Sequence, residues 1–204
     1  MIEFLKPVFK GPLAAYGAGV ACRTTLPPGT VHLLEWLNSP SAVADLLCRR
    51  ADLMRVADLR PVASAWMLTY TVLLLPPVVA AATLFGRVFP VAAREVAIEL
   101  DSQGLPRTVI IPHLGSNAAG QHAAERYMPL IDAHLTPLIT RLSEVSHLPA
   151  KILWGNVARR LDAILDQASA VSPAAGTIAQ LEADRDYLLR QRIWRPGQIG
   201  RAHV

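Results

Sequence analysis

The hydrophobic pattern predicts a mainly helical chain with one short β element. Apolar residues recur at the spacing of a single helix face over residues 40–54, 127–145 and 149–168. Between the first two of these segments, "EVAIELDSQGLPRTVIIP" alternates at Val96, Ile98 and Leu100, turns at a glycine, and continues through residues 109–111. That pattern is typical of a β-hairpin. We therefore expect an α+β fold, a helical bundle with a small β-hairpin.

The most apolar segment lies between Arg60 and Arg87 and contains no charged side chain. A helix needs about 20 apolar residues to cross a bilayer, so the length alone would allow a membrane span. Pro76 and Pro77 stand in its middle, however, and proline in a helix interior removes a hydrogen bond and clashes with the preceding turn. We expect the segment to form two central helices buried on all sides, and contact with a membrane surface stays open.

A proline also interrupts the pattern of residues 127–145, where Pro137 falls within the apolar stripe. Because proline lacks the N–H that an α-helix needs, we expect this long helix to bend at Pro137.

The triplet Trp154-Gly155-Asn156 is unusual because it stands early in a segment with a strong helical pattern. Glycine inside a helix costs about 1 kcal/mol relative to alanine. Gly155 would allow a neighbouring backbone to approach closely, and Asn156 lies at the border of the apolar stripe. One interpretation is a packing joint between helices with one buried polar contact. The other is that Trp154 and Asn156 line a docking surface.

Composition and length indicate one domain. The chain has 204 residues, of which 52% are hydrophobic and 18% charged, and its net charge of +4 comes mainly from arginine. We expect an irregular lead-in over residues 1–30, the helical domain over 31–190, and a basic tail over 191–204. No dense basic cluster with interleaved aromatic residues is present, which argues against a nucleic-acid partner.

The sequence carries no familiar catalytic or metal-binding motif. Phosphate-binding glycine loops, the HExxH zinc motif and the GxSxG nucleophile motif are all absent, and the six histidines are scattered. His134 falls on an apolar helix face, where a histidine is more often a hydrogen-bonded core residue than a metal ligand. Cys22 and Cys48 are far apart, which favours a reducing, cytosolic environment. From these residues alone we assign no catalytic and no metal-binding residue.

Three blocks in a particular order give the chain a resemblance to a known family. "SAWMLTYTVLLLPPVVAAATLFGRVFPV" is followed by the "LDSQGLP" hairpin, then by "RLSEVSHLPAKILWGNVARRLDAIL", and finally by "LLRQRIWRPGQ". This order resembles the ferric siderophore reductases of the FhuF type, and the resemblance covers about residues 60–198. The "LWGN" helix and the aromatic-rich block with its central prolines carry most of it.

The resemblance implies an oxidoreductase that reduces Fe(III) bound to a hydroxamate-type siderophore, so that Fe(II) can leave. It implies a cytoplasmic location, compatible with association with the inner membrane, and two partners, a ferric siderophore and an electron donor. It also implies a [2Fe-2S] cluster held by four cysteines near the C-terminus, in the order Cys-Cys, ten residues, Cys, two residues, Cys. Thiolates are the ligands that such clusters require.

The sequence departs from the family at that cluster. After "WRPGQ" the residues 199–204 contain no cysteine, and Cys22 and Cys48 stand far upstream. We therefore expect no cluster on this chain and no activity from it alone. We interpret the chain as truncated, with residues from 199 onward a candidate for non-native sequence. The alternative is a non-redox siderophore-binding domain or one related to siderophore synthetases.

The basic residues before the C-terminus complete the set of candidates. Arg190, Arg192 and Arg195 could attract an acidic electron donor or a charged ligand. A solvated basic tail is the other interpretation. The candidate docking or packing residues are therefore Trp154, Asn156 and Arg192.

Overall fold

A computed structural model of the chain describes residues 1–171 and 175–193. Its helical elements are η1 (Glu3–Leu5), η2 (Gly11–Ala18), α1 (Leu33–Leu37), α2 (Pro40–Met54), α3 (Leu59–Phe85), α4 (Ala123–Leu130), η3 (Ile131–Leu135), α5 (Thr136–Ser146), α6 (Ala150–Val171), α7 (Ala175–Arg185) and η4 (Asp186–Ile193). The strands are β1 (Val20–Cys22), β2 (Thr30–His32), β3 (Arg87–Val88), β4 (Ala97–Leu100), β5 (Pro106–Ile111) and β6 (Ser116–Asn117). The expected mainly helical fold with a small sheet is confirmed.

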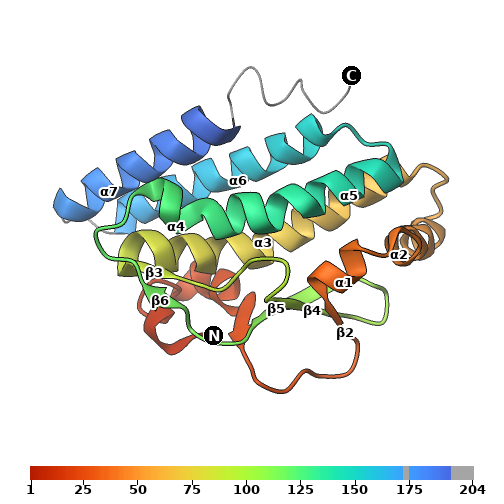
Figure 1. Cartoon of the computed structure of the whole chain (residues 1–204), viewed down its shortest axis with the longest axis horizontal. Helices are drawn as coiled ribbons and strands as arrows, with labels where there is room; N and C mark the ends of the chain where they lie inside the picture. The colour runs from red at the N-terminus through yellow and green to blue at the C-terminus, as the bar shows by residue number, and fades with distance from the viewer. Residues whose placement is uncertain (172–174, 194–204) are drawn as a thin grey trace.

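Helix α3 lies at the centre of the bundle. It contacts α2, α5, α6 and α7 on its helical sides, and β1, β5 and the 3₁₀ helix η2 pack against it from the sheet side. Figure 1 shows the long helices running side by side, with the sheet and the N-terminal segments below α3. The sheet and the helices therefore share one hydrophobic core built around α3.

The predicted hairpin is present and forms the middle of a four-stranded sheet. Strands β4 and β5 are antiparallel, with Ile98 opposite Val109, and the complete strand order is β1-β5-β4-β2. Strand β2 pairs antiparallel with β4, and β1 runs parallel to β5.

Residues 1–30 are more regular than the expected irregular lead-in. They contain η1, η2 and β1 and the first residue of β2. A strand of three residues shows no alternation of its own, and β1 is fixed by its pairing with the distant strand β5. The sequence signal is therefore too short to reveal it.

The apolar block forms one continuous helix, so the expected division at Pro76–Pro77 is wrong. Both prolines lie inside α3 and are buried, as are Leu74, Leu75 and Val79 around them. A proline in a helix interior costs about 3 kcal/mol, whereas burying one large aliphatic side chain contributes about 1.5–3 kcal/mol. Burial of several neighbours therefore outweighs the local penalty.

The long helix expected over residues 127–145 is divided into α4, the π-helical turn η3 and α5, and Pro137 lies in the first turn of α5. The turn before it, η3, is a π-helix, and both the backbone N–H and the hydroxyl of Thr136 bond the Ile131 carbonyl. The carbonyl of Ala133, four residues before Pro137, accepts instead from the backbone N–H of Ala93 at 2.8 Å. A carbonyl left free by the proline is thus used to hold the loop after α3.

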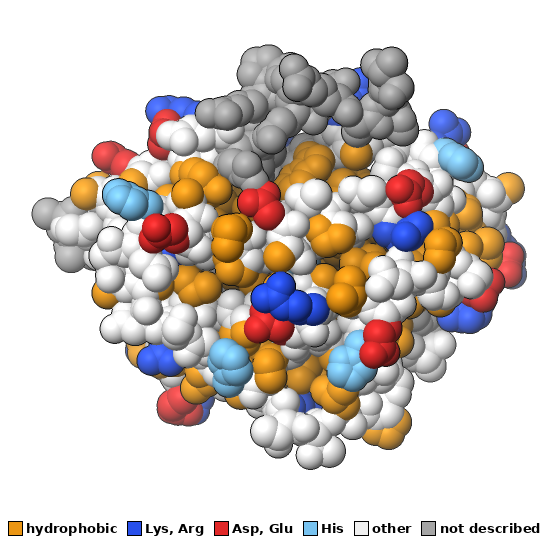
Figure 2. Space-filling model, viewed as in Figure 1, with side chains coloured by type: hydrophobic (Ala, Val, Ile, Leu, Met, Phe, Trp, Pro, Cys, Tyr) orange, Lys and Arg blue, Asp and Glu red, His pale blue; other side chains and the backbone are white. Residues whose placement is uncertain are grey.

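Most of the apolar surface of α3 lies inside the bundle. Helix α3 is long and apolar enough to cross a membrane, but 67% of its most apolar window is buried inside the protein. Figure 2 shows acidic and basic side chains interspersed with apolar ones on the face viewed. The expectation that the apolar block is buried in the core is therefore met by most of α3.

Candidate functional site

The triplet that stood out in the sequence lies on α6 against the first half of α3. Asn156 is 5% exposed, and its amide nitrogen donates to the Ser64 hydroxyl of α3 at 3.2 Å. Its amide oxygen accepts from the Arg159 guanidinium. Trp154 is half-buried against the core. Asn156 therefore makes a polar contact between two helices, and Trp154 is the member of the triplet with accessible surface and an aromatic ring.

The role expected for Gly155 is wrong. A Cβ built at Gly155 meets no heavy atom within 4 Å, so no neighbouring backbone uses the space. A true close approach is found at Gly19, where an added Cβ would lie 2.2 Å from the Leu73 carbonyl oxygen. The sequence does not distinguish Gly19 from Gly155, because the neighbouring residues do not reveal which glycine faces another segment.

The arginines near the C-terminus are only partly described. Arg190 lies on the surface, 3.5 Å from the carboxylate of Asp186. Arg192 belongs to η4, but its side chain and the whole of Arg195 lie outside the described residues. The docking role predicted for Arg192 stays a prediction.

The cysteines do not fit a four-thiolate cluster. Cys22 ends β1 and Cys48 lies in α2, and both are exposed and free. No group of three or more metal-binding side chains occurs in the part of the chain that the structure describes. A [2Fe-2S] centre of the family's kind needs four sulfur ligands, and the full sequence supplies two cysteines.

His134 is part of a closed column of aromatic rings. The rings of Trp36, Trp66, Tyr70 and His134 follow one another with centroid separations of 5.4, 5.2 and 5.6 Å. The His134 Nε2 atom lies 2.7 Å from the Tyr70 hydroxyl, and its Nδ1 contacts the Val91 carbonyl. Since a carbonyl only accepts, Nδ1 carries the proton and Nε2 accepts from Tyr70.

Burial controls ionisation in this column. It lowers the pKa of His134 from 6.5 to about 4, an effect that the bond to Val91 only partly offsets. Burial also raises the pKa of Tyr70 well above its ordinary value. His134 is therefore a neutral, hydrogen-bonded core residue, as the sequence suggested.

A second buried polar cluster lies near the other end of α3. The Asp184 carboxylate of α7 pairs with the Arg126 guanidinium of α4, and their side chains are 0% and 3% exposed. Asp184 also accepts from the Thr83 hydroxyl and the Gln180 amide, both at 2.8 Å. Tyr127 completes the cluster, with its hydroxyl 2.6 Å from Thr83. Burial, followed by the charge of Asp184, raises the pKa of Tyr127 well above its ordinary value.

This cluster is not fully satisfied. Arg126 donates to Asp184 and to the Gln121 carbonyl, but its Nε atom has no hydrogen-bond partner among the described residues. A buried donor without a partner costs about 1–3 kcal/mol.

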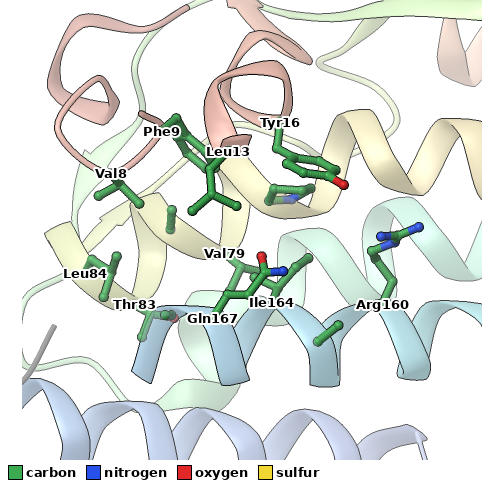
Figure 3. Close-up of a pocket in the computed structure, with 14 residues that line it drawn as sticks. Val8, Phe9, Leu13, Tyr16, Val79, Thr83, Leu84, Arg160, Ile164 and Gln167 are labelled. Carbon is green, nitrogen blue, oxygen red and sulfur yellow. The ribbon is translucent and has the colours of Figure 1, made fainter. Parts of the chain in front are cut away.

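A pocket opens beside the same half of α3, as Figure 3 shows. Its floor is formed by α3, from Pro76 to Leu84, and one wall is α6, from Arg160 to Ala168. The opposite wall comes from the N-terminal segment, through Val8, Phe9, Leu13 and Tyr16. Its cavity is small, about 50 Å³, and mostly apolar.

The sequence could not reveal the pocket or the Asp184 cluster. Arg126 and Asp184 read as ordinary surface charges on polar helix faces, and their pairing joins segments far apart in the chain. The pocket joins three such segments.

The comparisons with known proteins agree with the family suggested by the sequence. The model of the ferric iron reductase FhuF-like transporter family matches residues 64–198. A search of curated proteins gives no match.

Among solved structures, the fold is similar to aerobactin synthetase IucA from a hypervirulent pathotype of Klebsiella pneumoniae. The ATP-bound form has 18% sequence identity and a TM-score of 0.59 over 68% of this chain, and a second structure of the same synthetase has 17% identity and 0.59 over 78%. The chain spans 29% and 31% of the lengths of those two structures. At this identity the likeness concerns the fold, whereas the family model covers most of the chain. The chain therefore belongs to the FhuF-like ferric iron reductase family.

Proposed function

We propose that this chain is the helical body of a siderophore-iron reductase and that it binds a ferric hydroxamate-type siderophore. The observation that carries the proposal is the family match over residues 64–198, which spans α3, the hairpin, α5 and α6. Those elements form the rigid core of the molecule, so the family's shared part is the part that holds the fold together.

The chemistry of such a protein follows from the preferences of iron. Hydroxamate oxygens are hard ligands, which hold Fe(III) much more tightly than Fe(II). Transfer of one electron to the siderophore-bound Fe(III) therefore weakens its coordination and releases Fe(II). Here the iron of the siderophore is substrate, and the protein's task is to bind the complex where an electron can reach it.

The electron-carrying group is a separate matter, because the two cysteines of this chain do not fit the family's cluster. We therefore route no step through it and assign to this chain the binding of the siderophore alone. Trp154 is the candidate contact on α6, since Asn156 already bonds Ser64 and Arg159. An electron donor would be the second partner of the complete system.

The proposed location is the cytoplasm. Two free, exposed cysteines are expected in a reducing compartment, and they support this placement. Contact with the inner membrane would have to use the surface, because most of α3 is buried.

The experiment is a calorimetric titration of the purified chain with a ferric trihydroxamate siderophore, repeated with the same siderophore free of iron. Saturable binding of the ferric form, and weaker binding of the iron-free form, would support the proposal. Trp154→Ala should weaken binding, whereas Ile152→Ala, which removes an exposed apolar side chain from the same helix, should not. Absence of binding by the ferric form would refute it.

One second function is favoured by a specific observation, the structural likeness to aerobactin synthetase. A non-redox domain related to siderophore synthesis would handle the organic molecule before iron is bound. The same titration separates the two, because that alternative predicts preference for the iron-free siderophore.

A further inference from the structure

The pocket beside the second half of α3 has the form of an elongated groove. Helix α3 lines it at positions 76, 79, 80, 83 and 84, and helix α6 at positions 160, 163, 164, 167 and 168. Both sets follow the spacing of one helix face over slightly more than two turns. At a rise of 1.5 Å per residue, the floor is about 12 Å long.

The groove is not a site for the ferric siderophore. The enclosed part of the groove is only about 50 Å³, so a bound molecule would lie along it partly open to solvent, and its floor is apolar, whereas a ferric trihydroxamate is bulky and polar. One wall, from Val8 to Tyr16, also lies before the segment that the family model matches. The groove therefore concerns a different ligand and goes beyond the proposed function.

Its shape and lining select an unbranched apolar chain. Phe9 and Leu13 face Val79 and Ile164 across the groove, as Figure 3 shows. Ala80 and Ala163 are among the smallest side chains in the lining of this partly open groove. A thin aliphatic chain lying along the groove would remove part of its surface from water, at about 25 cal/mol for each square ångström.

One end of the groove carries a positive charge. Arg160 is the charged residue among the residues that line it, and Tyr16 lies at the same end in Figure 3. The nearest carboxylates of α6, Asp162 and Asp166, both pair with Arg185 of α7. In the described part of the chain no ion pair to Arg160 occurs, so its guanidinium has donors to offer an anion.

We infer that this groove binds an aliphatic monocarboxylate, with the chain along α3 and the carboxylate on Arg160. The guanidinium supplies the charge-assisted hydrogen bonds that a carboxylate accepts, and the Tyr16 hydroxyl is a further donor beside it. The apolar floor and the single cation at one end match the two parts of such a molecule.

The test is a calorimetric titration of the full chain with decanoate, kept below its micelle concentration. We expect saturable binding of one decanoate per chain and little binding of decyltrimethylammonium, which has the same tail and the opposite charge. Arg160→Gln should weaken binding about ten-fold or more, because a hydrogen bond to a charged group contributes roughly 1.5–3 kcal/mol and ten-fold corresponds to about 1.4 kcal/mol. Lys151→Gln removes an equal charge from the exposed start of α6 and should leave binding unchanged.

A second variant tests the groove rather than the charge. Ala163 is exposed within the lining of the groove, so the larger side chain of Ala163→Leu would fill part of the groove without entering the core. Binding should be lost while the thermal unfolding curve stays close to that of the unmodified chain.

Three results would overturn the inference: no saturable binding of decanoate, equal binding by Arg160→Gln, or equal binding by Ala163→Leu. Sedimentation with phosphatidylglycerol vesicles separates a free carboxylate from a lipid surface, and Arg160-dependent attachment to vesicles in place of decanoate binding would also overturn it. None of these results bears on siderophore binding, which is measured separately.

Discussion

The two halves of α3 differ in the side chains and polar groups that pack against them. From Leu59 to Leu75 the helix carries Trp66 and Tyr70 in a closed aromatic column, and Tyr70 bonds His134 at 2.7 Å. From Pro76 to Phe85 the same helix carries Thr83 in a buried ionic cluster and forms the floor of the groove. The buried Trp66 and Tyr70 of the first half bond neutral partners, whereas the second half contacts a buried ion pair and lines the groove.

The second half of α3 therefore lies beside the features that lower the stability of the folded protein. Buried ion pairs seldom stabilise a protein as well as packed apolar residues would, and a cavity loses packing contacts. The ion pair of the first half, between Arg60 and Asp58, is exposed rather than buried. The buried ion pair and the groove thus lie together along the second half of α3, and the following predictions test that contrast in order of decreasing effect.

The largest effect is expected in the ionic cluster. Asp184→Ala leaves the Arg126 charge buried without its partner, and it should lower the free energy of unfolding by about 3–5 kcal/mol. Urea denaturation followed by circular dichroism measures the change. The control is Asp166→Ala, which removes an exposed partner of Arg185 and should cost at most about 1 kcal/mol. Equal decreases in the free energy of unfolding for the two variants would contradict the difference between the buried and the exposed ion pair.

The aromatic column is expected to make the free energy of unfolding depend on pH. The folded pKa of His134, about 4, lies below its ordinary 6.5, so the unfolded chain binds more protons between these values. The free energy of unfolding should therefore fall by about 3 kcal/mol on this account as the pH falls from 6.5 to 4.

Denaturation at several pH values tests this dependence against His134→Gln, which has no titrating group at that position. The variant should be less stable at pH 7 but should lack this part of the pH dependence. A variant curve that runs parallel to that of the unmodified chain would mean that His134 does not cause it.

The junction between the two halves is predicted to be tightly packed. Gly19→Ala places a Cβ 2.2 Å from the carbonyl oxygen of Leu73, and the φ angle of Gly19, −68°, requires no glycine for conformational reasons. The added methyl group would overpack this contact, and we expect it to lower the free energy of unfolding by about 1–3 kcal/mol. Thermal unfolding measures this change, and an unchanged or higher Tm would show that Gly19, between η2 and β1, does not approach Leu73 of α3 this closely.

The smallest effect should have the opposite sign. Gly155→Ala adds a methyl group where no atom lies within 4 Å, and it removes the helix penalty of glycine. We expect the free energy of unfolding to rise by about 0.5–1 kcal/mol, because α6 becomes more stable. A loss of stability in the same denaturation assay would reveal a close contact at Gly155.

The sequence predicted those elements whose signals are local. The hairpin at Ile98 and Val109 was found from alternation and its glycine turn, and α2 and α6 were found from their apolar stripes. Each of these depends on residues within one or two turns of each other, so periodicity is sufficient.

Features that depend on distant contacts were missed or misread. Pro76 and Pro77 favour a break locally, but burial of the surrounding side chains keeps α3 continuous. Arg126 and Asp184 become a buried pair only when α4 and α7 meet, and the groove needs the N-terminal segment against α3 and α6. Asn156 lies on α6, as the helical pattern predicted, but its hydrogen-bond partner Ser64 could not be predicted from the sequence.

The central claim is that this chain belongs to the FhuF-like family, as its match shows, but that its two cysteines do not supply the four sulfur ligands of the family's redox centre. The most direct measurement is anaerobic reconstitution of the purified chain with iron and sulfide, followed by the visible spectrum and the count of bound iron and sulfide. We predict a colourless protein with no stoichiometric cluster, because Cys22 and Cys48 are its two thiols. A brown protein with iron and acid-labile sulfide bound in equal amounts to each chain would contradict the account.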